Sequence, residues 1–219
     1  MEALLVVNAD SASIKFAAYD ATSSPGEMNL IGKGHVALAG GELEFFVKCA
    51  NSSHPEIARS RPADRAFDHD KAMDRMFNWL DRHCGLKLTA VGHRVTDGGQ
   101  RYPASVRVTD EVLNDLEAVA PKHEAHELKG MRFLRGRLPD VPQVACFAPA
   151  LNRLPLQAVP AHATSEPVRP AAMPADEGKV IAANTLRCIE RVPTNAVIHA
   201  FPSIAPASPP ETCAAVNFR

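Results

Sequence analysis

The first part of the chain alternates short apolar runs with stretches rich in turn-forming residues. Apolar runs of this length, bounded by Gly, Pro, Ser or Asn, predict β-strands. We expect four strands in this part of the chain, at residues 3–9, 13–20, 30–38 and 42–48. The polar stretch that follows, 50–65, is predicted to be a loop.

Hydrophobic positions then recur at helical spacing, and two more buried runs lie between the predicted helices. The helices are expected at 66–83, directly after the N-cap residue Thr109, and at about 124–138. The additional strands are expected at 88–95 and 141–148. Strands that come first and then alternate with helices predict an α/β fold, a mixed sheet with helices packed on it.

The character of the sequence changes after Phe147, because 11 of the 18 prolines lie in 148–219. Only a helix at 177–191 and a strand at 195–201 are predicted there. We therefore divide the chain into a domain at 1–150 and an irregular, proline-rich and poorly ordered remainder at 151–219.

Charge and cysteine content exclude several classes of protein. The net charge is −1 and no Lys/Arg-rich block is present, which argues against a nucleic-acid partner. Five cysteines, an odd number with no C-x-x-C pair, indicate neither a disulfide framework nor a zinc ribbon. The start of the chain does not match a signal peptide and no apolar run reaches 18 residues, so we expect a cytoplasmic protein that does not enter a membrane.

The link between the first two predicted strands, NADSASIK, is unusually polar. Small polar side chains in a strand–turn–strand allow backbone N–H groups to approach phosphate oxygens. Lys15 adds a positive charge on the same side of the strand as Ser11 and Ser13. An ordinary polar hairpin tip is the alternative interpretation of this stretch.

A second candidate stretch is GHRVTDGG, residues 92–99. Arg94 comes at the end of an apolar strand, which is where open α/β sheets bind ligands. Its guanidinium offers a rigid donor fork suited to carboxylate or phosphate. The alternative is a structural Arg94–Asp97 pair beside a Gly-Gly turn. For His93 the two interpretations are a proton carrier and a strand-end histidine with a structural partner, and we favour the second.

The stretch HEAHE, residues 123–127, raises the possibility of a metal site. His123 and His126 are three residues apart, whereas the helix of a zinc protease carries its histidines four apart. Side chains at this spacing still share a helix face. We favour a solvated helix start over a metal site.

Four stretches, taken in order, resemble the N-terminal domain of the acetate kinase (acetokinase) family over residues 3–160. VVNADSASIKF resembles V-N-A-G-S-S-S-L-K-F, and AVGHRVTDGGQRY resembles A-V-G-H-R-V-V-H-G-G-x-x-F. APKHEAHELKGM is similar to A-P-L-H-N-P-x-N-L-x-G-I, and LPDVPQVACFAPALNR to L-P-x-L-P-Q-V-A-C-F-D-T-A-F-H-R. The resemblance implies the actin-like, ribonuclease H-like ATPase fold.

The resemblance also implies a reaction, the reversible conversion of ATP and acetate to ADP and acetyl phosphate. It implies ATP and Mg²⁺ as cofactors and a small carboxylate, acetate or propionate, as substrate. The matched positions are Asn8 for magnesium, Lys15 for the ATP phosphates, Ser11 and Ser13 for the phosphate turn, Arg94 for the carboxylate and transferring phosphoryl group, and His123 near that group. These roles suit phosphoryl transfer, which depends on positioning and charge neutralisation.

Several positions depart from the family pattern. The family's catalytic aspartate aligns with Ala148, which can neither accept a proton nor orient a nucleophile. A glycine of the opening loop is replaced by Asp10, which puts a carboxylate where phosphate oxygens are expected. Thr96 and Lys122 replace apolar residues of the acetate methyl pocket, and Asp97 replaces a histidine.

The family motif R-Y-G-F-H-G-T-S-H is not recognisable after residue 160, and the family's second glycine-rich phosphate loop is matched only by IHAFPSIA, residues 198–205, without its glycines. We expect the family's second domain to be absent from this chain. We therefore expect a phosphotransferase by kinship with little or no activity as this chain alone. A non-catalytic remnant that at most binds an anion at Arg94 is the alternative. An interaction module that uses the proline-rich tail is a third hypothesis, and no oligomeric state is predicted.

Overall fold

Eight strands form one sheet in the computed structural model, which describes residues 1–61, 67–96, 98, 101–119, 125–148 and 175–190. The sheet order is β5-β4-β3-β2-β1-β6-β8-β7. The strands are β1 (Glu2–Asp10), β2 (Ser13–Asp20), β3 (Leu30–Ala39), β4 (Glu42–Cys49), β5 (Glu56–Ser60), β6 (Lys87–Val95), β7 (Val106–Arg107) and β8 (Gln143–Phe147).

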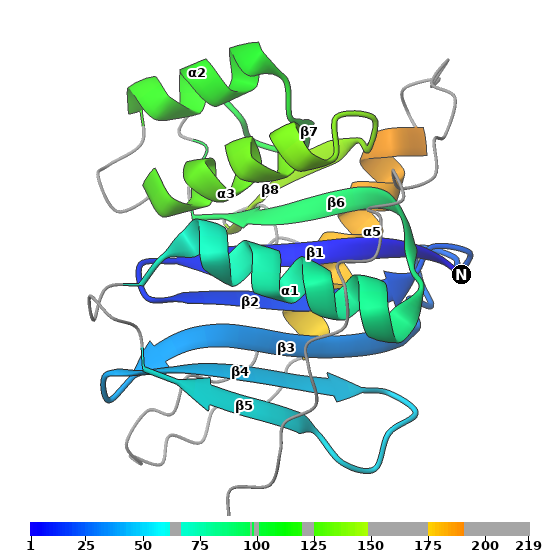
Figure 1. Cartoon of the computed structure of the whole chain (residues 1–219). Helices are drawn as coiled ribbons and strands as arrows, with labels where there is room; N and C mark the ends of the chain where they lie inside the picture. Colours follow the sequence, from blue (N-terminus) through cyan, green and yellow to red (C-terminus); the bar gives the residue numbers. More distant parts are fainter. Residues whose placement is uncertain (62–66, 97, 99–100, 120–124, 149–174, 191–219) are drawn as a thin grey trace, which may run out of the picture.

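Antiparallel pairing builds one half of the sheet and parallel pairing the other. Strands β1 to β5 pair antiparallel in chain order, and the β3–β4 turn is made by Gly40 and Gly41, both at positive φ. Strand β1 then pairs parallel with β6, and β6 with β8. The carboxyl ends of these three parallel strands therefore meet at one edge of the sheet (Figure 1).

The predicted strands before residue 50 and the two later ones are confirmed within one or two residues. The prediction of a loop over all of 50–65 is wrong, since β5 lies within it. Strand β5 was hidden by its polar sequence, EIARS, because as an edge strand it buries little. It is held by backbone pairing with β4, by Arg59 on Glu44 (2.7 Å) and by Glu56, which accepts from Trp79 Nε1 (2.5 Å).

Four helices cover the two faces of the sheet within the described residues. They are α1 (His69–Cys84), α2 (Asp110–Val119), α3 (Ala125–Arg137) and α5 (Ala175–Glu190), each close to its predicted position. Helices α1 and α3 lie on one face and α5 on the other, while α2 packs against α3 (Figure 1). None of the described helices is long and apolar enough to cross a membrane.

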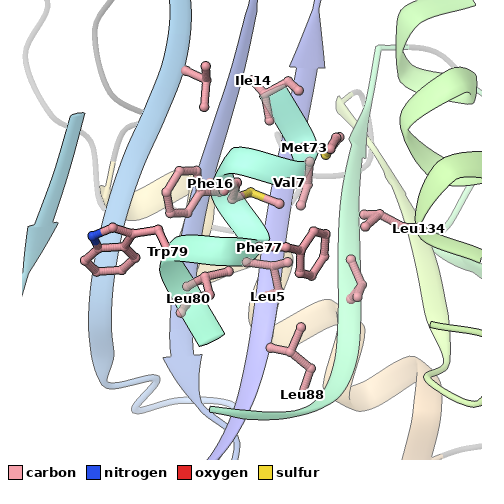
Figure 2. Packing of buried hydrophobic residues seen from close by; sticks show 14 of the residues in the cluster. Leu5, Val7, Ile14, Phe16, Met73, Phe77, Trp79, Leu80, Leu88 and Leu134 are labelled. Atoms are coloured by element: carbon pink, nitrogen blue, oxygen red, sulfur yellow. The ribbon is translucent and has the colours of Figure 1, made fainter. Parts of the chain in front are cut away.

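The larger core lies between the sheet and α1. Odd-numbered side chains of β1, including Leu5 and Val7, meet even-numbered side chains of β2 such as Phe16. Met73 and Phe77 of α1 pack onto them (Figure 2). The helix begins at Asp68, whose carboxylate accepts hydrogen bonds from the first-turn amides of Asp70 and Lys71, 3.1 Å each.

The opposite core lies between the sheet and α5. It contains Leu4 and Val6 of β1 and Val144 of β8, packed against Ile181 and its neighbours. Gly92 of β6 allows this close approach, since a Cβ there would lie 2.3 Å from Thr185 Oγ1 and 3.0 Å from Ile181 Cγ2. The helix predicted at 177–191 is thus part of the packed structure. The strand predicted at 195–201 lies outside the described residues, and so does the predicted domain boundary at residue 150. Both stay predictions.

The substitution Gly92→Ala is expected to lower the free energy of unfolding by about 1–3 kcal/mol, because the added methyl overpacks the contact with α5. Denaturant unfolding followed by circular dichroism measures the change. The matched control is Gly136→Ala on α3, where the added Cβ meets open space and a helical alanine is favoured. Equal stability of Gly92→Ala and the wild type would contradict the packing of α5 described above.

Candidate active site

Three candidate residues share one face of the sheet at the carboxyl end of the parallel strands. Asn8 and Lys15 are direct cross-strand partners of β1 and β2. Asn8 lies two residues after Val6, which faces α5, so its side chain is on the α5 face. Arg94 is two residues after Gly92 and lies on the same face. This edge is where ligands bind in open α/β sheets.

The side chain of Asp10 binds a backbone amide within the β1–β2 turn. Asp10 Oδ1 accepts a hydrogen bond from the Ser11 backbone N–H at 2.7 Å. Ser11 is exposed, whereas Ser13 is buried as the first residue of β2. A backbone donor that the sequence predicts for phosphate is therefore engaged by Asp10.

Arg94 is paired with a helix residue from the far end of the described chain. Its Nε donates to Glu177 Oε1 at 2.5 Å, and both side chains are about one quarter exposed. Glu177 lies in the first turn of α5. The arginine that the sequence predicts to bind an anion is thus already paired with a carboxylate of the chain. Its alternative predicted partner, Asp97, lies outside the described residues.

A second carboxylate is buried beside this site. Glu127 of α3 accepts from the Thr96 amide (3.0 Å) and from the Thr96 hydroxyl (2.7 Å). Burial raises the pKa of Glu127, and the charge of Asp10 raises it further, while the Thr96 hydrogen bonds and the charge of Arg94 lower it. Burial is the largest of these effects. Thr96 is consequently held by Glu127 rather than lining an apolar pocket.

Two histidines stack beneath the β1–β2 turn. His69 is buried and its Nε2 donates to the Asp10 carbonyl at 2.7 Å. The ring lies against His126, with centroids 4.6 Å apart and planes 10° apart. Burial lowers the pKa of His69, and the charge of His126 lowers it further. His69 therefore links the start of α1 to the candidate phosphate turn.

His93 has the structural role that the sequence indicates. The residue is buried in β6, and its Nε2 lies 2.7 Å from the side-chain oxygen of Gln143 in β8. Complete burial lowers the pKa of His93 to about 4. A neutral ring that ties two strands together does not serve as a proton carrier at neutral pH.

Comparison with known proteins decides the kinship. The family model described as the acetokinase family matches residues 3–166, well over half of the chain. The chain belongs to the acetokinase family. It is 35% identical over 180 residues to acetate kinase of Rhodopseudomonas palustris strain CGA009, a match that covers 77% of this chain and 44% of that protein.

Solved structures of this family have the same fold. A propionate kinase from Francisella tularensis matches with a TM-score of 0.57 and 26% identity, covering 70% of this chain and 38% of that one. Acetate kinase of Porphyromonas gingivalis matches with a TM-score of 0.58 and 22% identity, covering 76% and 42%. The mixed sheet with flanking helices is therefore the actin-like fold of these kinases. The chain spans less than half the length of the curated relatives it matches.

Residue 148, which the sequence resemblance aligns with an aspartate of the family, is an alanine. Ala148 directly follows β8, whose Cys146 pairs in register with Arg94. A carboxylate at residue 148 would lie at the same sheet edge as Arg94. The alanine side chain offers neither charge nor lone pair, so residue 148 supplies no acidic group at this edge of the sheet.

Two predicted positions, Lys122 and His123, lie outside the described residues. Of the HEAHE histidines only His126 is described; it lies half-buried in the first turn of α3 and stacks on His69. Among the residues with described side chains, no three His, Cys, Asp or Glu groups lie close enough to hold a metal ion.

The sequence did not indicate the roles of Glu177, Glu127 and His69. Glu127 and His126 stand in the HEAHE stretch, but their partners are Thr96, directly after β6, and His69 of α1. Glu177 is 83 residues from Arg94 along the chain. One signal was available for Glu127, since a carboxylate in a helix that packs against the sheet requires a partner.

The substitution Glu127→Gln is expected to remove a pH-dependent loss of stability. A raised pKa means that the folded protein holds this proton more tightly than the unfolded chain. The associated stability is complete below the ordinary pKa of 4.5 and is lost as pH rises through the raised folded pKa. Glutamine keeps the acceptor for the Thr96 amide and carries no charge, so the variant should lose less stability than the wild type above pH 4.5.

Urea unfolding at several pH values between 4 and 8 tests this expectation. Glu27→Gln is the matched control, because Glu27 is exposed. Glu127→Ala should instead destabilise by about 1–3 kcal/mol, since it leaves the Thr96 amide without its acceptor. If the unfolding free energies of the wild type and Glu127→Gln changed with pH in parallel, the raised pKa of a buried Glu127 carboxyl group would be contradicted.

Proposed function

We propose that this chain supplies the carboxylate- and phosphate-binding wall of an acetate kinase-type phosphotransferase. In this function Arg94 binds a small carboxylate, acetate or propionate, and the phosphoryl group that is transferred to it from ATP. Lys15, Ser11 and Ser13 bind the nucleotide phosphates. His123 is assigned a place near the phosphoryl group by its match to the family pattern.

One observation carries the proposal: Asn8, Lys15 and Arg94 share one face at one end of the sheet. Two cationic groups from different strands are thereby directed to the edge where this fold class binds ligands. Guanidinium and ammonium groups neutralise the negative charge of carboxylate and phosphate oxygens, which is the main requirement of phosphoryl transfer. Membership of the acetokinase family supports the same reaction class.

Mg²⁺ fits this site as a partner of the nucleotide and not as a resident ion. The ion prefers oxygen ligands and usually combines one or two protein oxygens with waters and substrate phosphates. Asn8 would offer its amide oxygen, and Lys15 lies beside it on β2. When bound with ATP, the ion neutralises charge on the phosphates.

We further propose that turnover by this chain alone is weak or absent. Ala148 supplies no acidic group at the sheet edge, and the loop amide of Ser11 is engaged by Asp10. Anion binding depends on Arg94 and does not require an acid at residue 148. A non-catalytic anion-binding protein is therefore the alternative function, and Ala148 is the observation that favours it.

Binding of acetyl phosphate to the purified chain tests the proposal. Isothermal titration calorimetry is expected to detect binding that weakens about tenfold or more in Arg94→Ala, because a charge-assisted hydrogen bond is lost. Arg82→Ala is the matched control, since Arg82 is exposed on α1. Formation of acetyl hydroxamate from Mg-ATP, acetate and hydroxylamine measures turnover in the same samples.

The outcomes separate the two functions. Turnover in the wild type that disappears in Arg94→Ala supports the kinase. Binding without turnover supports the non-catalytic alternative. Equal affinity of the wild type and Arg94→Ala would contradict both, because both place the anion on Arg94.

A further inference from the structure

The Arg94–Glu177 pair joins the candidate site to a helix whose position is fixed elsewhere. Arg94 lies near the end of β6, and Glu177 lies in the first turn of α5. The Nε to Oε1 distance is 2.5 Å, and each side chain is between one quarter and one third exposed. The carboxylate therefore occupies the Nε–H, one of the donors that an incoming anion could use.

Glu177 is held in place by packing that does not involve the pair. Ile181 and Ala182, one turn further along α5, are fully buried against β1 and β8. Thr185 donates to the Ile181 carbonyl and lies over Gly92, where the absence of a Cβ permits the contact. A carboxylate on a rigid helix loses little conformational freedom when it binds Arg94, so it is an effective intramolecular ligand.

The surroundings of Arg94 add further negative charge. Glu127 lies close enough to both Arg94 and Asp10 for their charges to act on its carboxyl group. Asp10 also occupies the Ser11 amide. Two anion-binding groups of the site, the loop amide and the guanidinium, are thus each engaged by a carboxylate of the chain itself.

We infer that Glu177 is an internal competitor for the anion site at Arg94. This inference rests on the proposed function. A carboxylate or phosphate ligand competes with the Glu177 carboxylate for the Nε–H and for the positive charge of the guanidinium, so Glu177 lowers the affinity of the site. If the ion pair only holds α5 against β6, the opposite result is expected: loss of Glu177 leaves the affinity for the anion unchanged or reduces it.

The substitution Glu177→Gln tests the inference with acetyl phosphate as the probe. Glutamine keeps the size of the side chain and removes the charge that attracts Arg94. The expected result is about tenfold tighter binding of acetyl phosphate, since a charge-assisted hydrogen bond no longer has to be broken. Glu190→Gln is the matched control, because it makes the same charge change at the exposed far end of α5.

A direct spectroscopic readout of Arg94 keeps the inference separate from the proposed function. In ¹⁵N-labelled protein the Arg94 Nε–H resonance should move in Glu177→Gln and in wild type saturated with acetyl phosphate, but not in Glu190→Gln. Glu177→Asp, whose carboxylate reaches less far, should show intermediate affinity.

The two possible failures are distinguishable. If Arg94→Ala abolishes binding while Glu177→Gln binds no more tightly than wild type, the proposed function stands and the competitor role is overturned. If neither wild type nor Glu177→Gln binds acetyl phosphate although the Arg94 resonance moves in Glu177→Gln, both are overturned. Tighter binding to Glu177→Gln that Arg94→Ala removes supports both.

Discussion

Parallel pairing of β1, β6 and β8 determines where the chemistry of this chain lies. The three strands run in the same direction, so their carboxyl ends meet at one edge. The β1–β2 hairpin returns the chain from that edge and places Lys15 beside Asn8. Arg94 lies near the end of β6. Its side chain is on the α5 face because residue 92, two positions earlier in the strand, faces α5. Every described candidate residue therefore depends on strand direction and register.

Three carboxylates of the chain bind polar or charged groups at this same edge. Asp10 binds the Ser11 amide, Glu127 binds Thr96, and Glu177 binds Arg94. A site made to attract anions would otherwise leave positive charge without a partner in partly buried surroundings, which costs free energy. These groups are therefore paired within the chain, and Ala148 adds no acidic group at this edge.

Local pattern predicted most of the fold because most elements bury a regular face. Buried runs gave β1 to β4, β6 and β8, and helical spacing gave α1 to α3. Strand β5 escaped prediction because its polar edge sequence is stabilised by pairing with β4 and by two partners in other elements, Glu44 of β4 and Trp79 of α1. The two-residue β7 is too short to leave a pattern.

The candidate site was predictable only in part. Asn8, Lys15 and Arg94 could be placed at one edge because strand ends and alternation determine their positions. The carboxylates that engage this edge could not be found, since Glu177 reaches Arg94 across 83 residues through the packing of α5 on Gly92. Contacts of that kind follow from tertiary packing and leave no local signal.

The central claim is that Arg94 is bound from within by Glu177. A double-mutant cycle of unfolding free energies with Arg94→Gln, Glu177→Gln and the double variant measures this coupling directly. The account predicts a favourable coupling of about 1 kcal/mol, the upper end for a partly exposed ion pair. Strictly additive effects of the two substitutions would contradict it.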